Sequence, residues 1–530
     1  MITLQQVSYY HPDKDILFSE VNFSVNRQEK VGLIGNNGCG KSTLLKIITG
    51  DSQIVEGARS VQSIPYYVPQ VYGQFDHLTI AQVLGVDLKV NALKQILAGS
   101  PAVEHFDVLE NDWSVEERCY AAMETWGLSG FKLEDKLANL SGGQKTKVFL
   151  SGIAVHQPDL VLMDEPTNHL DGPARSQLLD VVTHTAMTLV VVTHDRTILN
   201  ALPKICELTP SGIRTYGGNY EFYVEQKEIE RSALDNDILS KEKMLREYRE
   251  KERETLERKQ KLDARGKRKQ AQAGLPKIVM NTLRNAAEAS TAKIRRVHAD
   301  RVNGVARVLQ ELRNEIPDID KMKFDFDNPS LHKGKILIKA ADINFSYGEH
   351  PMWPVGLSFQ ISSGERLAIY GNNGAGKTTL IRMLLGDLVP STGEILTAEY
   401  SSVYIDQDYS LIENSVSVFE QARAFNPQLP EHEVGTRLNR FLFPRVEWSK
   451  PCSVLSGGER MRLALCCLTI CTKAPDLVFL DEPTNNLDIQ NVEILTTALK
   501  KYKGTLVVIS HDELFLQRIE ISRRINLSVI

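Results

Sequence analysis

The sequence predicts an α/β protein in which two copies of one domain are joined by a long α-helical hairpin. Three observations predict this fold class. A glycine-rich motif occurs twice, at residues 35–42 and 371–378, and the segments after each copy repeat in the same order. Between the copies lies a segment rich in Glu, Lys, Arg, Leu and Ala, a composition that favours long helices. We therefore expect domains at 1–222 and 331–530 and a helical linker at 223–330.

Composition indicates a globular protein with room for several domains. The chain has 530 residues, of which 42% are hydrophobic and 24% charged. Its apolar runs are only long enough for strands, and no secretory leader opens it, so we expect a cytoplasmic location. The seven cysteines have no C-x-x-C spacing, which argues against a zinc site or an iron–sulfur cluster and favours buried free thiols.

Charge is divided unevenly along the chain. The formal net charge is −5, yet residues 241–308 carry 20 Lys/Arg against 9 Asp/Glu, which leaves −16 on the remainder. One segment is therefore basic and the rest is acidic.

The two glycine-rich motifs are predicted to bind phosphate. Both fit G-x-x-x-x-G-K-[ST], in which backbone N–H groups surround phosphate oxygens, the lysine reaches the β- and γ-phosphates and the hydroxyl binds Mg²⁺. Apolar strands at 27–33 and 364–369 should enter the loops, and helices at 43–49 and 379–385 should leave them, which places phosphate at a helix N-terminus. Two nucleoside triphosphates are expected. The expected ATP-binding residues of the loops are Gly35, Asn36, Asn37, Gly38, Cys39, Gly40, Lys41, Ser42, Thr43, Gly371, Asn372, Asn373, Gly374, Ala375, Gly376, Lys377, Thr378 and Thr379.

Aromatic and amide side chains flank each loop. β-rich stretches at 2–25 and 336–361 precede the loops, and Tyr347 in the second could stack on adenine, with Tyr10 or His11 in the equivalent place of the first. Simple packing of these rings in a β-layer is the alternative. After each loop, a predicted strand ends in Gln70 or Gln407, whose side-chain carbonyl could reach Mg²⁺ or the attacking water.

A Leu-Ser-Gly-Gly motif closes a helix-rich stretch in each half, at 79–140 and 416–454. We expect the serine and glycines to precede helices at 145–154 and 460–471 and to form a capped, open N-terminus suited to phosphate. The motif residues are Ser141, Gly142, Gly143, Gln144, Ser456, Gly457, Gly458 and Glu459.

Acidic pairs and histidines end the next predicted strands. Asp164 and Asp481 follow four-residue apolar runs, which are typical of buried parallel strands whose ends face a ligand crevice, and both are placed for Mg²⁺. The next residues, Glu165 and Glu482, could orient the water that attacks the γ-phosphate. Each half then has a strand ending in a histidine that could donate to the γ-phosphate. These histidines are His194 and His511.

With these motifs in this order, each half resembles the ATPase domain of the ATP-binding cassette superfamily. The resemblance implies that the signature of one domain closes over the nucleotide of the other. One site would then combine the first loop with Ser456, Gly457 and Gly458, and the other would combine the second loop with Ser141 and the two glycines after it. It further implies that ATP and Mg²⁺ are bound, with Ser42, Thr378, Gln70 and Gln407 near the metal, and that both sites hydrolyse ATP.

The linker is predicted to be a basic helical hairpin. One helix should run from Glu221 to Gln272, at 1.5 Å per residue about 75 Å long, and a second from Lys277 to Asn314, with a break at 273–276. Residues 258–301 have 13 Lys/Arg against 3 Asp/Glu, which indicates binding to a nucleic-acid backbone rather than a merely solvated coil. The partly apolar tip, 275–280, could contact bases, rRNA or a tunnel wall. The expected RNA-binding residues are Lys267, Arg268, Lys269, Lys277, Arg295 and Arg296.

The whole chain resembles the ABC-F family of ribosome-associated ATPases. The resemblance rests on two cassettes, on a basic linker after residues 216–220 (Tyr-Gly-Gly-Asn-Tyr) and on the lack of an apolar membrane segment. The resemblance implies a monomer that enters the tRNA exit site with ATP bound and pushes its linker toward P-site tRNA, 23S rRNA and the peptidyl-transferase centre. Family members include translation factors and antibiotic-resistance proteins. Two departures are the lack of a basic tail after the second cassette and of an obvious basic insertion between Gln70 and Leu140.

Two other classes of ATPase remain as alternatives. An energising subunit of a membrane transporter would need a membrane partner and would gain nothing from a basic arm. A DNA-repair or chromosome-structure ATPase would carry zinc-binding cysteine pairs or far longer coiled coils within one cassette, so we expect neither a membrane nor a DNA partner.

Overall fold

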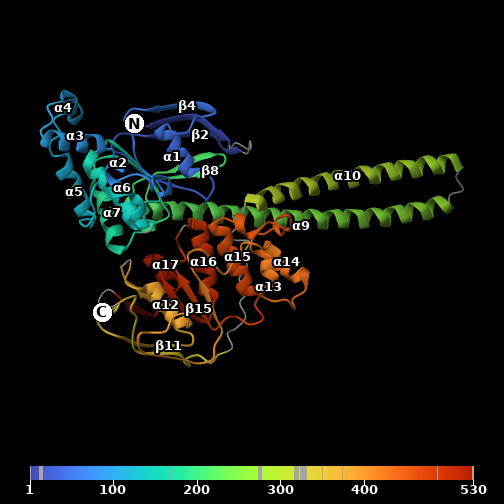
Figure 1. Cartoon of the computed structure of the whole chain (residues 1–530). Coiled ribbons are helices and arrows are strands. Elements are labelled where there is room, and N and C mark those ends of the chain that lie inside the picture. The colour runs from blue at the N-terminus through green and yellow to red at the C-terminus, as the bar shows by residue number, and fades with distance from the viewer. Residues whose placement is uncertain are drawn as a thin grey trace. The chain divides into compact units, whose positions relative to one another are not determined.

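The computed structural model describes residues 2–10, 16–168, 170–272, 277–315, 322, 331–348, 350–372, 374–485 and 487–527 (Figure 1). The chain divides into two compact units. One unit contains residues 1–223 and 323–530 and holds both cassettes, and the other contains residues 224–322. All seven cysteines are free thiols and six are buried, which confirms the prediction from their spacing.

Each cassette is built on a largely parallel sheet. The first has the strand order β5-β6-β7-β3-β8-β9, in which only the β8–β9 pair is antiparallel, and the second has the all-parallel order β14-β15-β16-β12-β17. The strands are β3 (Lys30–Ile34), β5 (Tyr66–Val68), β6 (Leu160–Asp164), β7 (Thr188–Val192), β8 (Ile205–Thr209), β9 (Gly212–Tyr216), β12 (Arg366–Tyr370), β14 (Ser402–Ile405), β15 (Leu477–Asp481), β16 (Thr505–Ile509) and β17 (Arg523–Asn526).

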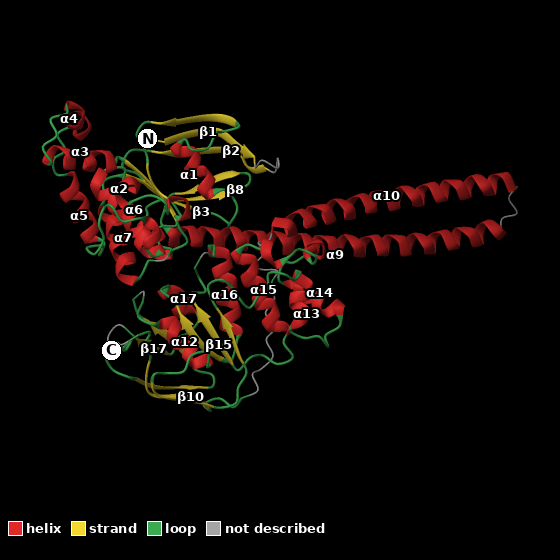
Figure 2. Ribbon diagram, in the orientation of Figure 1, coloured by secondary structure: helices red, strands yellow, loops and turns green. Residues whose placement is uncertain are grey.

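The central strands are apolar except at one end residue each, because both of their faces are covered. Every residue of β6, β7, β15 and β16 is buried. As Figure 2 shows, a three-stranded antiparallel sheet accompanies each parallel sheet, with the orders β2-β1-β4 and β11-β10-β13. These strands are β1 (Ile2–Tyr10), β2 (Ile16–Val25), β4 (Glu56–Val61), β10 (Ile336–Asn344), β11 (Leu357–Ser362) and β13 (Thr392–Thr397).

The helix after each phosphate loop packs in the core between the two sheets. α1 (Lys41–Thr49) contributes Leu44, Leu45, Ile47 and Ile48 to the first core, and α12 (Lys377–Leu385) occupies the same place in the second. Both helices begin two residues before the predicted start. Packing of each helix in the core therefore holds the phosphate loop at its N-terminus in place.

The remaining helices surround the sheets. Those of the first cassette are α2 (Ile80–Val83), α3 (Asp87–Leu97), α4 (Val103–Leu109), α5 (Val115–Thr125), α6 (Gly142–His156), α7 (Gly172–His184) and α8 (Arg196–Ala201). Those of the second are α13 (Val418–Ala424), α14 (Glu431–Arg440), α15 (Gly457–Ile470), α16 (Ile489–Lys501) and α17 (Glu513–Arg518). α6 and α15 begin three residues before the predicted starts, because the signature glycines form their first turns.

The linker forms the predicted pair of helices. α9 (Tyr220–Gln272) and α10 (Lys277–Glu315) run side by side in Figure 2, and Arg313 Nη2 of α10 donates to Glu242 Oε1 of α9 at 2.6 Å. Ile238 and Leu309 are buried within this hairpin. The predicted bounds were within one residue of those observed. The predicted break, 273–276, lies outside the described residues, and so do residues 275–276 and the side chains of residues 277–280 of the predicted tip.

Two candidate nucleotide sites

The phosphate loops need glycine at two positions each. φ is +81° at Gly38 and +99° at Gly40 in the first loop, and +83° and +86° at the matching glycines, Gly374 and Gly376, of the second. L side chains rarely adopt this left-handed region. A Cβ at Gly40 would also lie 2.7 Å from Leu17 Cδ2. The glycines of the motif are therefore required by backbone conformation and close packing.

Both loop lysines are held inside their own loops. Lys41 Nζ donates to Gly35 O at 2.7 Å, and Lys377 Nζ donates to Gly371 O at the same distance. Each ammonium group thereby lies among the backbone N–H groups that are expected to surround phosphate. Asn373, one of the expected ATP-binding residues, lies outside the described residues.

Each Asp at the end of a central strand faces the loop hydroxyl. Thr378 Oγ1 donates to Asp481 Oδ2 at 2.8 Å, and the Ser42 hydroxyl is hydrogen-bonded to Asp164. Burial raises the pKa of both aspartates. Buried Asp164 Oδ1 has no hydrogen-bond partner among the described residues. A carboxylate beside a hydroxyl is the hard oxygen donor set that Mg²⁺ prefers, so these residues fit the ion.

Two tyrosines that the motif analysis overlooked support these aspartates. Tyr67 OH donates to Asp164 Oδ2 at 3.2 Å, and Tyr404 OH donates to Asp481 Oδ2 at 3.3 Å. Each tyrosine stands three residues before the glutamine that lines the same cavity, Gln70 or Gln407. This repeated offset was a signal available in the sequence. The sequence did not show which residue each tyrosine contacts.

The glutamates after these aspartates occupy an unusual backbone conformation. φ is +48° at Glu165 and +47° at Glu482, and their N–H groups donate to Val192 O and Ile509 O, each at 2.8 Å. A non-glycine residue in this region is uncommon and is often found at functional sites. The neighbouring strands thus hold both side chains at the crevice in the same pose.

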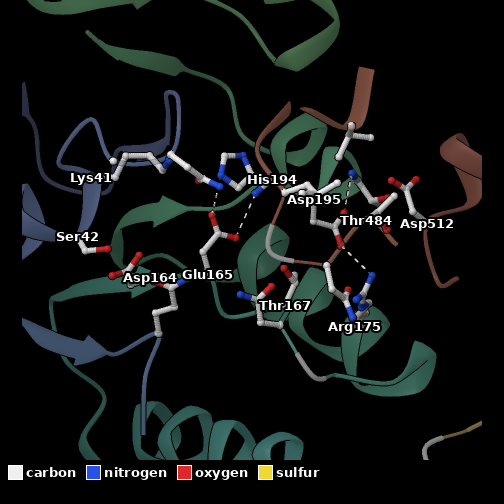
Figure 3. A pocket seen from close by; sticks show the side chains of 18 of the residues that line it. Lys41, Ser42, Asp164, Glu165, Thr167, Arg175, His194, Asp195, Thr484 and Asp512 are labelled. Carbon is white, nitrogen blue, oxygen red and sulfur yellow. Dashed lines mark hydrogen bonds and ion pairs between the residues drawn. The ribbon is translucent and has the colours of Figure 1, made fainter. Parts of the chain in front are cut away.

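Each glutamate contacts the histidine of its own cassette. His194 N donates to Glu165 Oε2 at 3.3 Å and its Nε2 lies 3.2 Å from Oε1, as the dashed lines in Figure 3 mark. His511 Nε2 lies 3.2 Å from Glu482 Oε1. The structure therefore brings together the two residue types predicted to act on the attacking water and the γ-phosphate.

Burial dominates the protonation of these pairs. It raises the pKa of Glu165 to about 8 and also raises that of Glu482. It lowers the pKa of His194 well below its usual value, and burial together with the Lys377 charge lowers that of His511 to about 4. Both imidazoles are therefore neutral at neutral pH.

A signature motif reaches one of the two cavities. Ser141, Gly142 and Gly143 line the second cavity together with Lys377 and Glu482. Described residues around the first cavity include Thr484 and others from the second cassette, but not Ser456, Gly457 or Gly458. The two cassettes are also joined where Asn37 N donates to Asp488 Oδ2 at 2.9 Å.

The signature serines cap helices in both cassettes. Ser141 forms a capping box with Gln144 on α6, and Ser456 forms one with Glu459 on α15. A Cβ at Gly458 would clash with Asn491, which explains the need for glycine there. The predicted capped N-terminus is thus present, although the glycines lie inside the helix.

The two aromatic residues expected to stack on adenine differ in position. Tyr347 lines the second cavity, its ring is 71% exposed, and its OH shares a 3.2 Å hydrogen bond with Thr379 Oγ1. At the first cavity, Leu17 is among the described lining residues and Tyr10 is not. His11 lies outside the described residues.

Comparison with known proteins identifies the family. The ABC transporter family matches residues 18–168 and 355–485. The energy-dependent translational throttle protein EttA of Escherichia coli K12 is 31% identical over 98% of this chain and 90% of its own length, and the ATP-binding protein Uup of Haemophilus influenzae is 29% identical over 94% and 75%. A crystal structure of the archaeal ribosome recycling factor aABCE1 with stalk protein aP1 shares the fold, with a TM-score of 0.60 at 18% identity over 97% of this chain and 86% of that one.

None of the described helices is both long and apolar enough to cross a bilayer. This chain carries two phosphate loops, two acidic strand ends and two signature helices, one of each in either cassette, and it aligns with these relatives over both cassettes. The chain belongs to the ABC-F family of tandem-cassette ATPases.

Proposed function

We propose that this ATPase acts on the ribosome, where it closes on ATP in the tRNA exit site and directs its helical arm toward P-site tRNA and the peptidyl-transferase centre. We propose domain boundaries at 1–222, 223–330 and 331–530. The observation that carries this proposal is the basic hairpin of α9 and α10. The name of EttA, a translational throttle protein, agrees with a role in translation. Regulation of translation and protection of the ribosome from an antibiotic are both compatible with this action.

The arm presents cations to solvent along both helices. Most of the described basic side chains in its distal half are exposed, including Arg258, Arg265, Arg268, Arg296 and Arg301, whereas Lys259 is half-buried. The side chains of Lys267, Lys269, Lys277 and Arg295 lie outside the described residues. A surplus of exposed cations on an acidic protein supports binding to the phosphate backbone of RNA, here 23S rRNA and tRNA.

ATP hydrolysis is assigned to the two sites as follows. The loop N–H groups with Lys41 or Lys377 hold the phosphates, and Ser42 or Thr378 would hold Mg²⁺ with the nearby aspartate and glutamine. When bound, Mg²⁺ would neutralise phosphate charge. Glu165 and Glu482 orient the attacking water, and the adjacent histidines donate to the γ-phosphate.

The cycle has a simple energetic basis. ATP binds the closed arrangement better than the open one because the signature of the opposite cassette contacts the γ-phosphate only when closed. Hydrolysis removes that difference in affinity, so the cassettes separate and the protein leaves the ribosome.

The tyrosines behind the aspartates give a first test of the sites. We expect Tyr67→Phe and Tyr404→Phe together to raise the Mg²⁺ concentration needed for half-maximal ATP turnover about tenfold, because each removes a hydrogen bond that orients a proposed metal-binding carboxylate. Titration of Mg²⁺ at saturating ATP measures this. Tyr66→Phe is the control, since Tyr66 OH donates to Phe149 O instead. An unchanged Mg²⁺ requirement in the double variant would contradict the assignment.

Sedimentation through sucrose tests ribosome binding directly. A Glu165→Gln/Glu482→Gln protein should co-migrate with ribosomes in ATP and not in ADP. Neutralising Lys267, Arg268, Lys269, Arg295 and Arg296 to glutamine should abolish co-migration. Raising the salt from about 50 to 200 mM should weaken binding steeply, because phosphate contacts release counterions.

Proximal arginines of the same hairpin provide the matched control. Arg253 and Arg307 are 82% and 80% exposed, and each pairs with a glutamate one turn on, so their charge is already compensated. Their replacement by glutamine should leave co-migration intact. Failure to co-migrate in either nucleotide would overturn the ribosomal proposal and favour a membrane partner, as in the energising subunit of a transporter.

A further inference from the structure

The two cassettes differ at one charged position beside the nucleotide sites. In the first cassette Asp171 caps α7, and the fourth residue after it is Arg175. In the second cassette Asp488 caps α16 with the same geometry, and the fourth residue after it is Val492. Arg175 lines both cavities, and Val492 lines the first. The repeated architecture therefore carries a cation in one copy and an aliphatic side chain in the other.

Arg175 is poorly placed to stabilise its own helix. It lies near the N-terminus of α7, where the helix dipole disfavours positive charge. Its side chain is only 19% exposed. A largely buried cation that is unfavourable for its helix calls for another role.

The guanidinium group is held by few groups of its own cassette. Its Nε donates to Leu170 O at 3.1 Å, and Nη1 lies 3.8 Å from Asp195 Oδ2, which is too far for a hydrogen bond. In Figure 3, where Thr484 and Asp512 of the second cassette are also labelled, a dashed line marks the ion pair between Arg175 and Asp195. The contacts with Leu170 and Asp195 leave donors of its fork available to a ligand.

Arg175 lines the second cavity together with Lys377, Glu482 and His511. These three residues belong to the second cassette, so Arg175 reaches a site whose phosphate loop lies on the opposite cassette. Arg175 also lines the first cavity, together with Glu165.

We propose that Arg175 is a positioning cation supplied by the first cassette to the second ATP site, where it steadies the γ-phosphate during hydrolysis. The inference rests on the second site taking ATP between the cassettes, as proposed above. The oxygen of the attacking water forms a bond to the γ-phosphorus while the bond between the γ-phosphorus and the β,γ-bridging oxygen breaks, which gives ADP and inorganic phosphate. The water proton passes to Glu482 and then to solvent. Arg175 transfers no proton. It offsets the negative charge on the γ-phosphoryl oxygens.

Val492, the matching residue of the second cassette, is uncharged, so the opposite cassette supplies no cation from this position to the first site, and the two sites should hydrolyse ATP at different rates. Val492 is 5% exposed and lines the first cavity. With Arg175 present, the second site is expected to be the faster one.

The test isolates each site in the full chain. Glu165→Gln leaves the second site active, and Glu482→Gln leaves the first. In the Glu165→Gln protein, Arg175→Val, which copies the residue of the second cassette, should lower kcat about tenfold with KM nearly unchanged, because the charge acts on the transition state. In the Glu482→Gln protein the same change should alter kcat less than about twofold. Arg175→Lys should restore part of the lost kcat, because it restores the charge but not the fork.

Each outcome decides the inference. Equal losses in both backgrounds would show a structural role at the cassette contact, and no loss would show no role, so either overturns it. If Arg175→Val lowers the unfolding temperature, Arg175→Gln replaces it in both backgrounds, because glutamine keeps a polar side chain without the charge. Ser141→Arg in the Glu165→Gln protein distinguishes a failure of the composite second site from a failure of the role of Arg175. If Ser141→Arg fails to lower turnover, the composite site is wrong, whereas a loss with Ser141→Arg alone refutes only the role of Arg175.

Discussion

Replacement of both Glu165 and Glu482 by glutamine should lower ATP turnover at least about a hundredfold while ATP still binds. Glutamine has nearly the same shape, so the loops and hydroxyls that hold the phosphates are unchanged. It cannot accept a proton, so it cannot act as the base that activates the attacking water. Release of phosphate at saturating ATP measures turnover, and retention of a fluorescent ATP analogue measures binding.

The same double variant should accumulate in the closed arrangement, because hydrolysis no longer removes the affinity of the signature for the γ-phosphate. A cross-link between cassettes that forms with ATP and not with ADP reports closure. Asp159→Asn is the matched control, since Asp159 is an exposed carboxylate just before β6, at the end opposite Glu165. Residual turnover within about tenfold of the unchanged protein would contradict the assignment of these glutamates.

Local sequence signals predicted the elements that local physics fixes. The phosphate loops were found because glycines in the left-handed region, followed directly by a helix, require a short and specific residue pattern, as the positive φ angles at Gly38 and Gly40 show. The bounds of α9 and α10 were found because Gly274 and Pro276 interrupt an otherwise uniform helical composition. Continuous apolar runs identified the buried strands, since a strand covered on both faces has no polar side.

The same local signals could not predict contacts between residues that are far apart in the sequence. The hydrogen bonds of Tyr67 and Tyr404 to the aspartates join residues 97 and 77 positions apart. The matching offset of these tyrosines from Gln70 and Gln407 marks them in the sequence but does not identify the aspartates as their partners. Arg175 was overlooked because its neighbours at the second cavity belong to the other cassette. The start of α6 was placed too late because two consecutive glycines disfavour a helix interior, and the Ser141 capping box overrides that preference at a first turn.

Ser141→Arg should abolish hydrolysis at the second site and spare the first. Ser141 lines the second cavity with Gly142 and Gly143, so an arginine there would fill the space that the γ-phosphate must occupy between signature and loop. In the Glu165→Gln background we expect turnover to fall by about a hundredfold or more. In the Glu482→Gln background it should stay close to that of the parent. The cost to helix capping, about 1 kcal/mol, is too small to unfold the cassette, and a thermal melt checks this.

The mirror variant, Ser456→Arg, shows whether the cassettes adopt a second arrangement. Ser456 is not among the described residues that line the first cavity, so a static reading of the structure predicts no effect of this change on the first site. Closure of both sites on ATP predicts the reverse. Turnover in the Glu482→Gln background should then fall as far as Ser141→Arg lowers it in the Glu165→Gln background. Because the two signature helices are capped in the same way, any difference between the two losses would measure how unequally the two sites close, rather than a difference in folding.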